Sequence, residues 1–184
     1  IYAFDPEIFR ELDRLDENKE SLTEAVKNLA EQEEVKYELV EDYWIDINSP
    51  EKLWKADKIK RDFEIEETDK EKAEVSEKAE ISGDAIVKEG AEIKPGTVIE
   101  GKAFIGENAV IGPNTVIRNA TVSRNSQVRN ASVEEGLVFE RSIVDPFVQL
   151  EDFIIGEESD IKSGTVIRES FIGARSFIEM NNSI

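Results

Sequence analysis

Aliphatic residues recur at every sixth position over the stretch from Val75 to Ile117, and a small residue follows four positions after each of the first seven. The aliphatic positions are Val75, Ile81, Val87, Ile93, Ile99, Ile105, Ile111 and Ile117. The small ones are Ala79, Ala85, Ala91, Thr97, Ala103, Ala109 and Thr115. A period of six fits neither an amphipathic helix nor an alternating strand. It is typical of a parallel β-helix, in which each coil stacks on the one before.

The aliphatic positions continue beyond Ile117, and their spacing alternates between five and six as far as Ile161. They are Val122, Val128, Val133, Phe139, Val144, Leu150, Ile155, Ile161, Ile167, Ile172, Ile178 and Ile184. In the shorter steps the small residue moves one place earlier, to Ala120, Ala131, Ser142 and Ser170, with Phe153 as the exception. We therefore expect each five-residue step to lack one corner residue while the inward aliphatic column stays unbroken.

This six-residue repeat resembles the repeat of the left-handed β-helices of the hexapeptide-repeat family. Three flat faces need roughly 17 or 18 residues a coil, which predicts about six coils over residues 75–184 and a prism on the order of 30 Å long. The fold class is therefore predicted to be mainly β, with a left-handed parallel β-helix preceded by a different kind of segment.

The first sixty or so residues carry short strand patterns and helix signals. Strands are predicted over residues 1–4, 35–39 and 44–45. Asp5-Pro6 and Ser49-Pro50 look like N-caps followed by proline, and Ser21 to Glu24 fits a capping box. The helices are expected after each of these starts, the last ending near 61–63. We predict a partial α/β segment over residues 1–63, an acidic linker over 64–74 and the β-helix domain over 75–184.

Composition narrows the function. The net charge of -19 disfavours nucleic acid and anionic membranes as partners, and no apolar run approaches the roughly 18 residues of a membrane span. The chain has no cysteine, which excludes disulfides, and no histidine, which removes the usual general base and the commonest zinc ligand. A cytoplasmic protein is the default expectation.

Three N-terminal motifs resemble another family. The run from Ile1 to Phe9, the helix start at Leu22-Thr23-Glu24-Ala25, and the run from Tyr43 to Glu51 occur in that order. They look like the C-terminal third of the catalytic domain of sugar-1-phosphate nucleotidylyltransferases, of the glucose-1-phosphate thymidylyltransferase-like type. Many members continue into a β-helix.

The resemblance implies an enzyme that joins a nucleoside triphosphate to a sugar-1-phosphate with Mg²⁺ and releases pyrophosphate, giving a dTDP- or UDP-glucose type product. It assigns Asp46 to the metal, and Tyr2 and Trp44 to the sugar site. The competing interpretation makes Tyr2 and Trp44 core aromatics and Asp46 a turn-capping residue. Asn48 stands where the family usually has glycine, in a turn that asparagine tolerates.

No complete catalytic set lies in this sequence. The glycine-rich loop, the basic triphosphate contacts, the first metal aspartate and the sugar-binding Glu-Lys segment of the family are missing, so we expect the 184-residue chain to be inactive by itself. Two alternatives stay open. One is a non-catalytic regulatory or scaffold homologue. The other is a sugar acyltransferase, which the absence of histidine disfavours. The β-helix is expected to assemble a homo-oligomer or to carry regulation.

Overall fold

The computed structural model describes residues 2–15, 22–32, 36–39, 41, 43–70 and 72–184. The chain divides into two compact units, one up to Trp44 and the other from Ile45 to Ile184. Among the helices of the described residues, none is both long enough and apolar enough to cross a bilayer.

The described residues of the first unit form two helices, α1 (Glu7–Asp13) and α2 (Leu22–Gln32). Both were predicted, and their buried faces centre on Ile8 and Ala25. The predicted cap of α1 is wrong by one residue, because Pro6 occupies the N-cap position and no side chain caps the helix. Ser21, on which the predicted capping box of α2 depends, lies outside the described residues.

The strands predicted in residues 1–63 are not found. Residues 2–4, 36–39 and 43–46 are described and belong to no strand, while Ile1 and Val35 lie outside the described part. A strand needs a neighbour for its backbone hydrogen bonds, and the alternating side chains there are exposed, with Tyr37 and Leu39 each more than three-quarters accessible. The described part of 1–63 is helical and irregular, not α/β.

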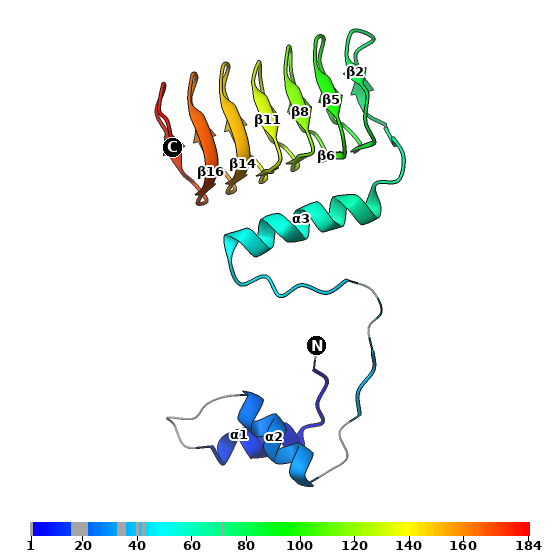
Figure 1. Ribbon diagram of the computed structural model, residues 1–184, viewed down its shortest axis with the longest axis vertical. Coiled ribbons are helices and arrows are strands. Elements are labelled where there is room, and N and C mark those ends of the chain that lie inside the picture. Colours follow the sequence, from blue (N-terminus) through cyan, green and yellow to red (C-terminus); the bar gives the residue numbers. More distant parts are fainter. Residues whose placement is uncertain (1, 16–21, 33–35, 40, 42, 71) are drawn as a thin grey trace. The chain divides into compact units, whose positions relative to one another are not determined.

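The second unit is a parallel β-solenoid of about six coils, matching the predicted left-handed β-helix (Figure 1). It has three faces. Face 1 consists of β1 (Glu74–Val75), β4 (Glu92–Ile93), β7 (Val110–Ile111), β10 (Gln127–Val128), β13 (Ile143–Val144), β15 (Asp160–Ile161) and β17 (Phe177–Ile178). Face 2 consists of β2 (Glu80–Ile81), β5 (Val98–Glu100), β8 (Val116–Arg118), β11 (Ser132–Glu134) and the first halves of β14 (Gln149–Ile155) and β16 (Val166–Ile172). Face 3 consists of β3 (Ala85–Val87), β6 (Ala103–Ile105), β9 (Thr121–Val122), β12 (Leu137–Val138) and the second halves of β14 and β16.

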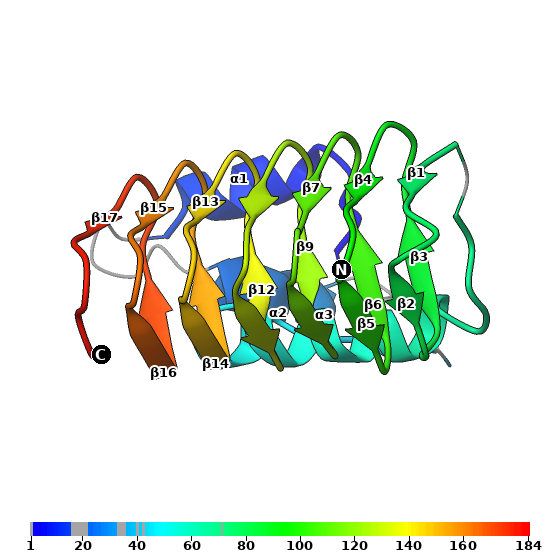
Figure 2. The same ribbon diagram turned by 90° about the horizontal axis from the view of Figure 1, so that it is seen from above.

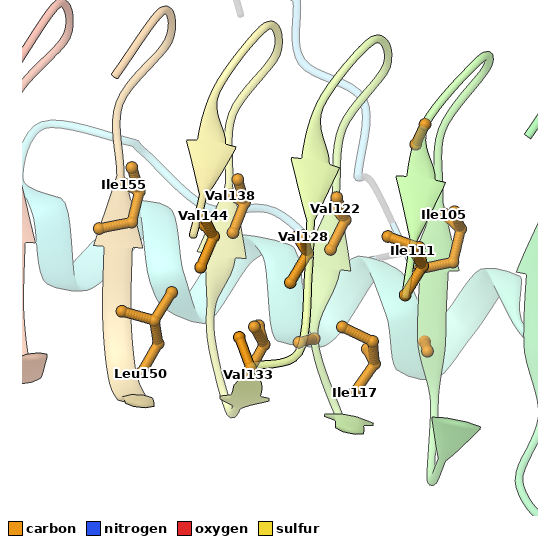
Figure 3. Packing of buried hydrophobic residues seen from close by; sticks show 14 of the residues in the cluster. Ile105, Ile111, Ile117, Val122, Val128, Val133, Val138, Val144, Leu150 and Ile155 are labelled. Carbon is orange, nitrogen blue, oxygen red and sulfur yellow. The ribbon is translucent and has the colours of Figure 1, made fainter. Parts of the chain in front are cut away.

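The interior is a continuous column of aliphatic side chains from successive coils (Figure 3). The strict six-residue spacing is confirmed from Val87 to Ile117, where every aliphatic residue of the repeat is at least 98% buried. Val75 and Ile81, at the start of the repeat, are partly buried and pack against this core. One later position is wrong. Val138, not Phe139, points inward, so the steps after Val133 run five, six, six and five instead of alternating.

The five-residue steps gather at one corner. Face 2 leads to face 3 in five residues at 117–122, 133–138, 150–155 and 167–172, whereas the two earlier passages, 81–87 and 99–105, take six. One further short step, from 128 to 133, lies between faces 1 and 2. The predicted loss of a corner residue without a break in the column is confirmed, and the loss recurs along one edge of the prism.

Phe153 takes a position that small residues hold in the other coils. Its side chain is 1% exposed. The residue at the same place one coil earlier is Gly136, where a β-carbon would lie 2.5 Å from two ring carbons of Phe153. The smallest residue of the column therefore makes room for the largest, and the packing stays dense.

Helix α3 (Pro50–Glu64) precedes the coils and runs alongside them (Figure 2). As predicted, Ser49 caps it, accepting a hydrogen bond from the Lys52 amide at 3.3 Å, and proline follows. The contacts of the second unit include this helix, so the compact division falls before α3 and not at residue 63. The range 64–74 is not a solvated connector throughout, because Ile65 is buried and Asp69 forms a parallel bridge with Ile86.

Candidate functional site

Helix α3 covers the outward side of face 3. The outward residues of that face are Ile86, Phe104, Thr121, Leu137, Ile154 and Phe171 in successive coils. Thr121, Leu137 and Ile154 are buried although they point away from the interior, whereas Phe171, in the last of these coils, is 52% exposed. Face 3 is therefore a two-sided layer, with the aliphatic column on one side and α3 on the other.

Polar contacts fix the helix along the corner between faces 2 and 3. The Trp54 indole nitrogen donates to the Glu135 carbonyl oxygen at 2.8 Å, and the Lys58 ammonium lies 3.6 Å from the Glu135 carboxylate. At the other end of the helix, Arg61 donates to the Lys102 carbonyl oxygen at 3.0 Å, and Lys102 donates back to the Asp62 carbonyl oxygen at 2.8 Å. The helix thus runs against the order of the coils.

Asp57 lies in the middle of this contact. Its carboxylate accepts a hydrogen bond from the Thr121 hydroxyl at 2.6 Å and another from Arg61 at 3.0 Å. Burial raises the pKa of Asp57 above its ordinary value, and the hydrogen bonds from Thr121 and Arg61 offset only part of that rise. The helix and the solenoid therefore share a buried, titratable contact.

A groove of about 450 Å³ opens beside the first turn of α3. The helix contributes Pro50, Glu51 and Trp54; the solenoid contributes Asp152, Phe153, Ile154, Glu169, Ser170 and Phe171. Its surface is mainly apolar, and three carboxyl groups line it. Burial, followed by the neighbouring carboxylates of Glu135, Glu151 and Glu169, raises the pKa of Asp152. A hydrogen bond from Ser49 lowers the pKa of Glu51.

The residues predicted to bind substrate and metal lie in different units. Tyr2 stacks on Phe4, with ring centroids 5.5 Å apart. Tyr2 and Trp44 are 64% and 67% exposed, so neither lies in the core of the described residues. Asp46 is exposed and accepts a hydrogen bond from the Asn48 side-chain amide at 3.0 Å. This contact spans the turn before α3, where the competing interpretation places Asp46, and the cap of α3 itself is Ser49. The assignment of these residues to a sugar and metal site stays a prediction.

The described residues do not form a Mg²⁺ site on their own. No group of three histidine, cysteine, aspartate or glutamate side chains within them could hold a metal ion. Asp46 fits as one exposed oxygen ligand, which is how Mg²⁺ is often held when phosphates and water complete its shell.

Sequence reasoning missed the groove and the α3 contact. Trp54 and Asp152 are about a hundred positions apart in the sequence, and nothing in the local pattern of either predicts the other. The sequence contains one signal for the α3 contact, the three adjacent apolar residues Leu137, Val138 and Phe139. A strand with one side in solvent would have only its inward residues apolar. An apolar residue on both sides of a strand indicates a layer on both sides.

Several solved structures that are similar to part of this chain are named as acyltransferases or acetyltransferases. GDP-perosamine N-acetyltransferase from Caulobacter crescentus matches at 16% identity and a TM-score of 0.33, over 61% of this chain and 47% of that one. A putative acetyltransferase from Bacillus cereus matches at 15% identity and a TM-score of 0.38, over 59% of this chain and 73% of that one. LpxA from Acinetobacter baumannii matches at 17% identity and a TM-score of 0.30, over 61% of this chain and 64% of that one. The chain spans about half the length of the first of these, and at such values the likeness says nothing about a substrate.

A search of curated proteins finds no match. The model of the GMPPB C-terminal domain, in contrast, matches residues 81–184, which is more than half of the chain and nearly all of the solenoid. The chain therefore belongs to the family defined by the GMPPB C-terminal domain, a family of sugar-1-phosphate nucleotidyltransferases.

Proposed function

We propose that the chain is the C-terminal portion of a Mg²⁺-dependent sugar-1-phosphate nucleotidyltransferase that makes an NDP-sugar, of the dTDP- or UDP-glucose type, and pyrophosphate. The observation that carries the proposal is the family match over residues 81–184, placed after a Trp44-Ile45-Asp46 segment that resembles the end of such a catalytic domain. The likeness to acyltransferase structures bears on the fold only.

Asp46 would supply one carboxylate to the metal, and Tyr2 and Trp44 would lie against the sugar. When bound, Mg²⁺ supplies charge neutralisation on the phosphates as pyrophosphate leaves. The exposure of all three side chains is compatible with contact to a small-molecule substrate. In this proposal the solenoid serves assembly into a homo-oligomer or regulation, and α3 connects it to the segment that carries Asp46.

Two other functions compete with this one. A sugar acyltransferase of the hexapeptide type relies on a histidine base, and the sequence has none. A non-catalytic regulatory or scaffold homologue has one feature in its favour, Asn48 in place of the usual glycine. Activity separates these candidates.

The test uses the full-length protein, of which this chain is a part, with sugar-1-phosphates, each nucleoside triphosphate and Mg²⁺. We expect pyrophosphate release with at least one pair, and a loss of about 100-fold or more in kcat for Asp46→Ala, on the scale of one lost charge-stabilising group. The 184-residue chain alone should release none. Glu41→Ala, at an exposed position near Asp46 in the sequence, is the control. No release with any pair, or full activity of Asp46→Ala, would overturn the proposal.

A further inference from the structure

Face 2 carries a row of charges along the length of the solenoid, on the strands labelled β5 to β16 in Figure 1. The row, here called the charged row, is Glu100, Arg118, Glu134, Glu151 and Arg168, each the register neighbour of the next. Within the row Arg118 lies 2.7 Å from Glu134, and Arg168 lies 3.1 Å from Glu151. All five side chains are 32–57% exposed, so the row is accessible from outside.

The charged row is complementary to a second copy of itself that runs in the opposite order, because acidic residues then face basic ones. Consider a two-fold axis that runs parallel to β11, the middle strand of the row, and passes over it. This axis would pack face 2 of two copies together, with the coils of one copy in the opposite order to those of the other. It would place Glu100 opposite Arg168 of the second copy, and Arg118 opposite Glu151. Each of these pairs occurs twice, and only Glu134 meets its own kind.

The parallel row on the other side of each strand follows the same symmetry. This neutral row is Val98, Val116, Ser132, Gln149 and Val166. The same axis places Val98 opposite Val166 of the second copy and Val116 opposite Gln149, with no charge facing an apolar residue. A two-fold axis along the length of the prism would instead keep the coils of both copies in the same order. It would place the neutral row of one copy opposite the charged row of the other.

Face 1 lacks this complementarity. The equivalent operation about β10, its middle strand, would place Lys94 opposite Lys162 and Glu92 opposite Asp160. Like charges held face to face oppose docking. Face 3 is already covered over most of its length by α3. Face 2 is therefore the face that suits a second copy.

Phe147 gives an independent indication at the edge of face 2. It lies at the corner before β14 with φ of 67°, in the left-handed region, and is 69% exposed. The other corners of this edge with a positive φ hold Gly96, Asn114, Asn130, Gly164 and Asn181, residue types that adopt such a backbone readily. A bulky aromatic residue there is strained, and backbone strain concentrates at functional positions. The two-fold axis would bring Phe147 to the coil of Asn114 and Val116 of the second copy.

We propose that face 2, together with Phe147, is a two-fold interface at which a second copy of this chain docks with its coils in the opposite order. The inference deepens the assembly role proposed above and rests on it. A face about 25 Å long, from five strands at roughly 4.8 Å spacing, is at the small end of specific interfaces, so we expect a micromolar dissociation constant.

Cysteine cross-linking tests the direction of docking, because the chain has no cysteine of its own. Ser132→Cys lies on the axis and should cross-link to itself through a bismaleimide that spans about 10 Å, the distance between packed sheets. Val98→Cys should not, because the two copies would be about 19 Å apart along the prism, four strand spacings. A mixture of Val98→Cys and Val166→Cys chains should cross-link to each other. Gln127→Cys, in the middle of face 1, is the control.

Charge exchange tests the pairing. Arg118→Glu should weaken dimerisation of the chain by about tenfold or more in sedimentation, because it sets like charges opposite each other twice. Arg118→Glu combined with Glu151→Arg should restore it to within about threefold of the original. These two positions are two coils apart in one chain, so the rescue would act between copies.

Phe147→Asn separates docking from folding. Asparagine relieves the corner, so the urea midpoint of the chain should stay equal or rise, while dimerisation weakens by about tenfold. Self-cross-linking of Val98→Cys, absence of it for Ser132→Cys, or unchanged dimerisation of Phe147→Asn would overturn the proposal. A dimer that forms without a Ser132→Cys cross-link would leave assembly standing and exclude this face. Pyrophosphate release by the full-length protein is independent of all three outcomes.

Discussion

The indole nitrogen of Trp54 donates a hydrogen bond of 2.8 Å to the backbone carbonyl oxygen of Glu135, 81 residues further along the chain. Glu135 is a corner residue with φ of 50°, in a passage from face 2 to face 3 that is one residue shorter than in the first coils. The helix that precedes the solenoid is therefore anchored on the corner where the repeat changes length.

Loss of the Trp54 contact should weaken the solenoid measurably. Trp54→Phe keeps an aromatic ring but removes the donor, which should cost about 1 kcal/mol of unfolding free energy. Trp54→Ala should cost about 3 kcal/mol, because it also empties part of the contact with face 3. Urea unfolding followed by circular dichroism measures both. Trp44→Phe, at an exposed position, should stay within about 0.5 kcal/mol of the original, and an equal effect of the two phenylalanine variants would contradict the prediction.

The pH dependence of stability should carry the signature of Asp57. Its pKa is raised in the folded state by burial, so the folded chain holds the proton more tightly than the unfolded chain. This contribution to stability is complete below the unfolded carboxyl pKa and is lost as the pH rises through the raised folded value.

Asp57→Asn should remove that component. The unfolding free energy of the original chain, minus that of Asp57→Asn, should therefore fall as the pH is raised from about 4 towards neutrality. Asparagine can still accept the hydrogen bond that Thr121 donates. Asp62→Asn, on the exposed side of the same helix, should show no such trend. A constant difference between the original chain and Asp57→Asn across this range would refute the assignment.

Two glycines should respond oppositely to alanine. At Gly136 a β-carbon would lie 2.5 Å from both the ring and the carbonyl oxygen of Phe153, so Gly136→Ala should destabilise the chain by about 1–3 kcal/mol through overpacking. At Gly173 a β-carbon meets nothing within 4 Å and φ is not positive, so Gly173→Ala should be neutral or stabilise by up to about 1 kcal/mol. Thermal unfolding of both variants checks the signs, and a destabilisation of similar size at both sites would count against the packing described.

The Phe153 ring should be among the most costly side chains to remove. Phe153→Ala leaves a cavity beside Gly136, and we expect a loss of about 3–5 kcal/mol. Phe177→Ala, at a side chain that is 61% exposed, is the matched control and should change stability by less than about 1 kcal/mol. Comparable losses for the two variants, measured by urea unfolding, would show that Phe153 is not the packing element inferred above.

The aliphatic repeat predicted the solenoid because an inward residue recurs every five or six positions, which can be recognised in the local sequence. The prediction failed at Phe139 for a physical reason. Leu137, Val138 and Phe139 are all apolar, so their pattern does not tell which of them points inward, and Leu137 lies buried on the outward side that α3 covers. The strands expected around Tyr37 and Trp44 failed because a strand depends on neighbours that no local pattern supplies. The groove joins residues distant in sequence, so composition and spacing could not indicate it.

The shortened corner and its helix bear on how the molecule comes apart. A bare stack of coils would fray from either end, one coil at a time, since each coil contacts only its neighbours. Helix α3 touches the corner or face of coils that include Lys102, Thr121, Glu135 and Ile154. Unwinding any of these coils also strips contacts from the helix, so opening of the inner coils should be coupled, and amide exchange there should report one shared opening free energy.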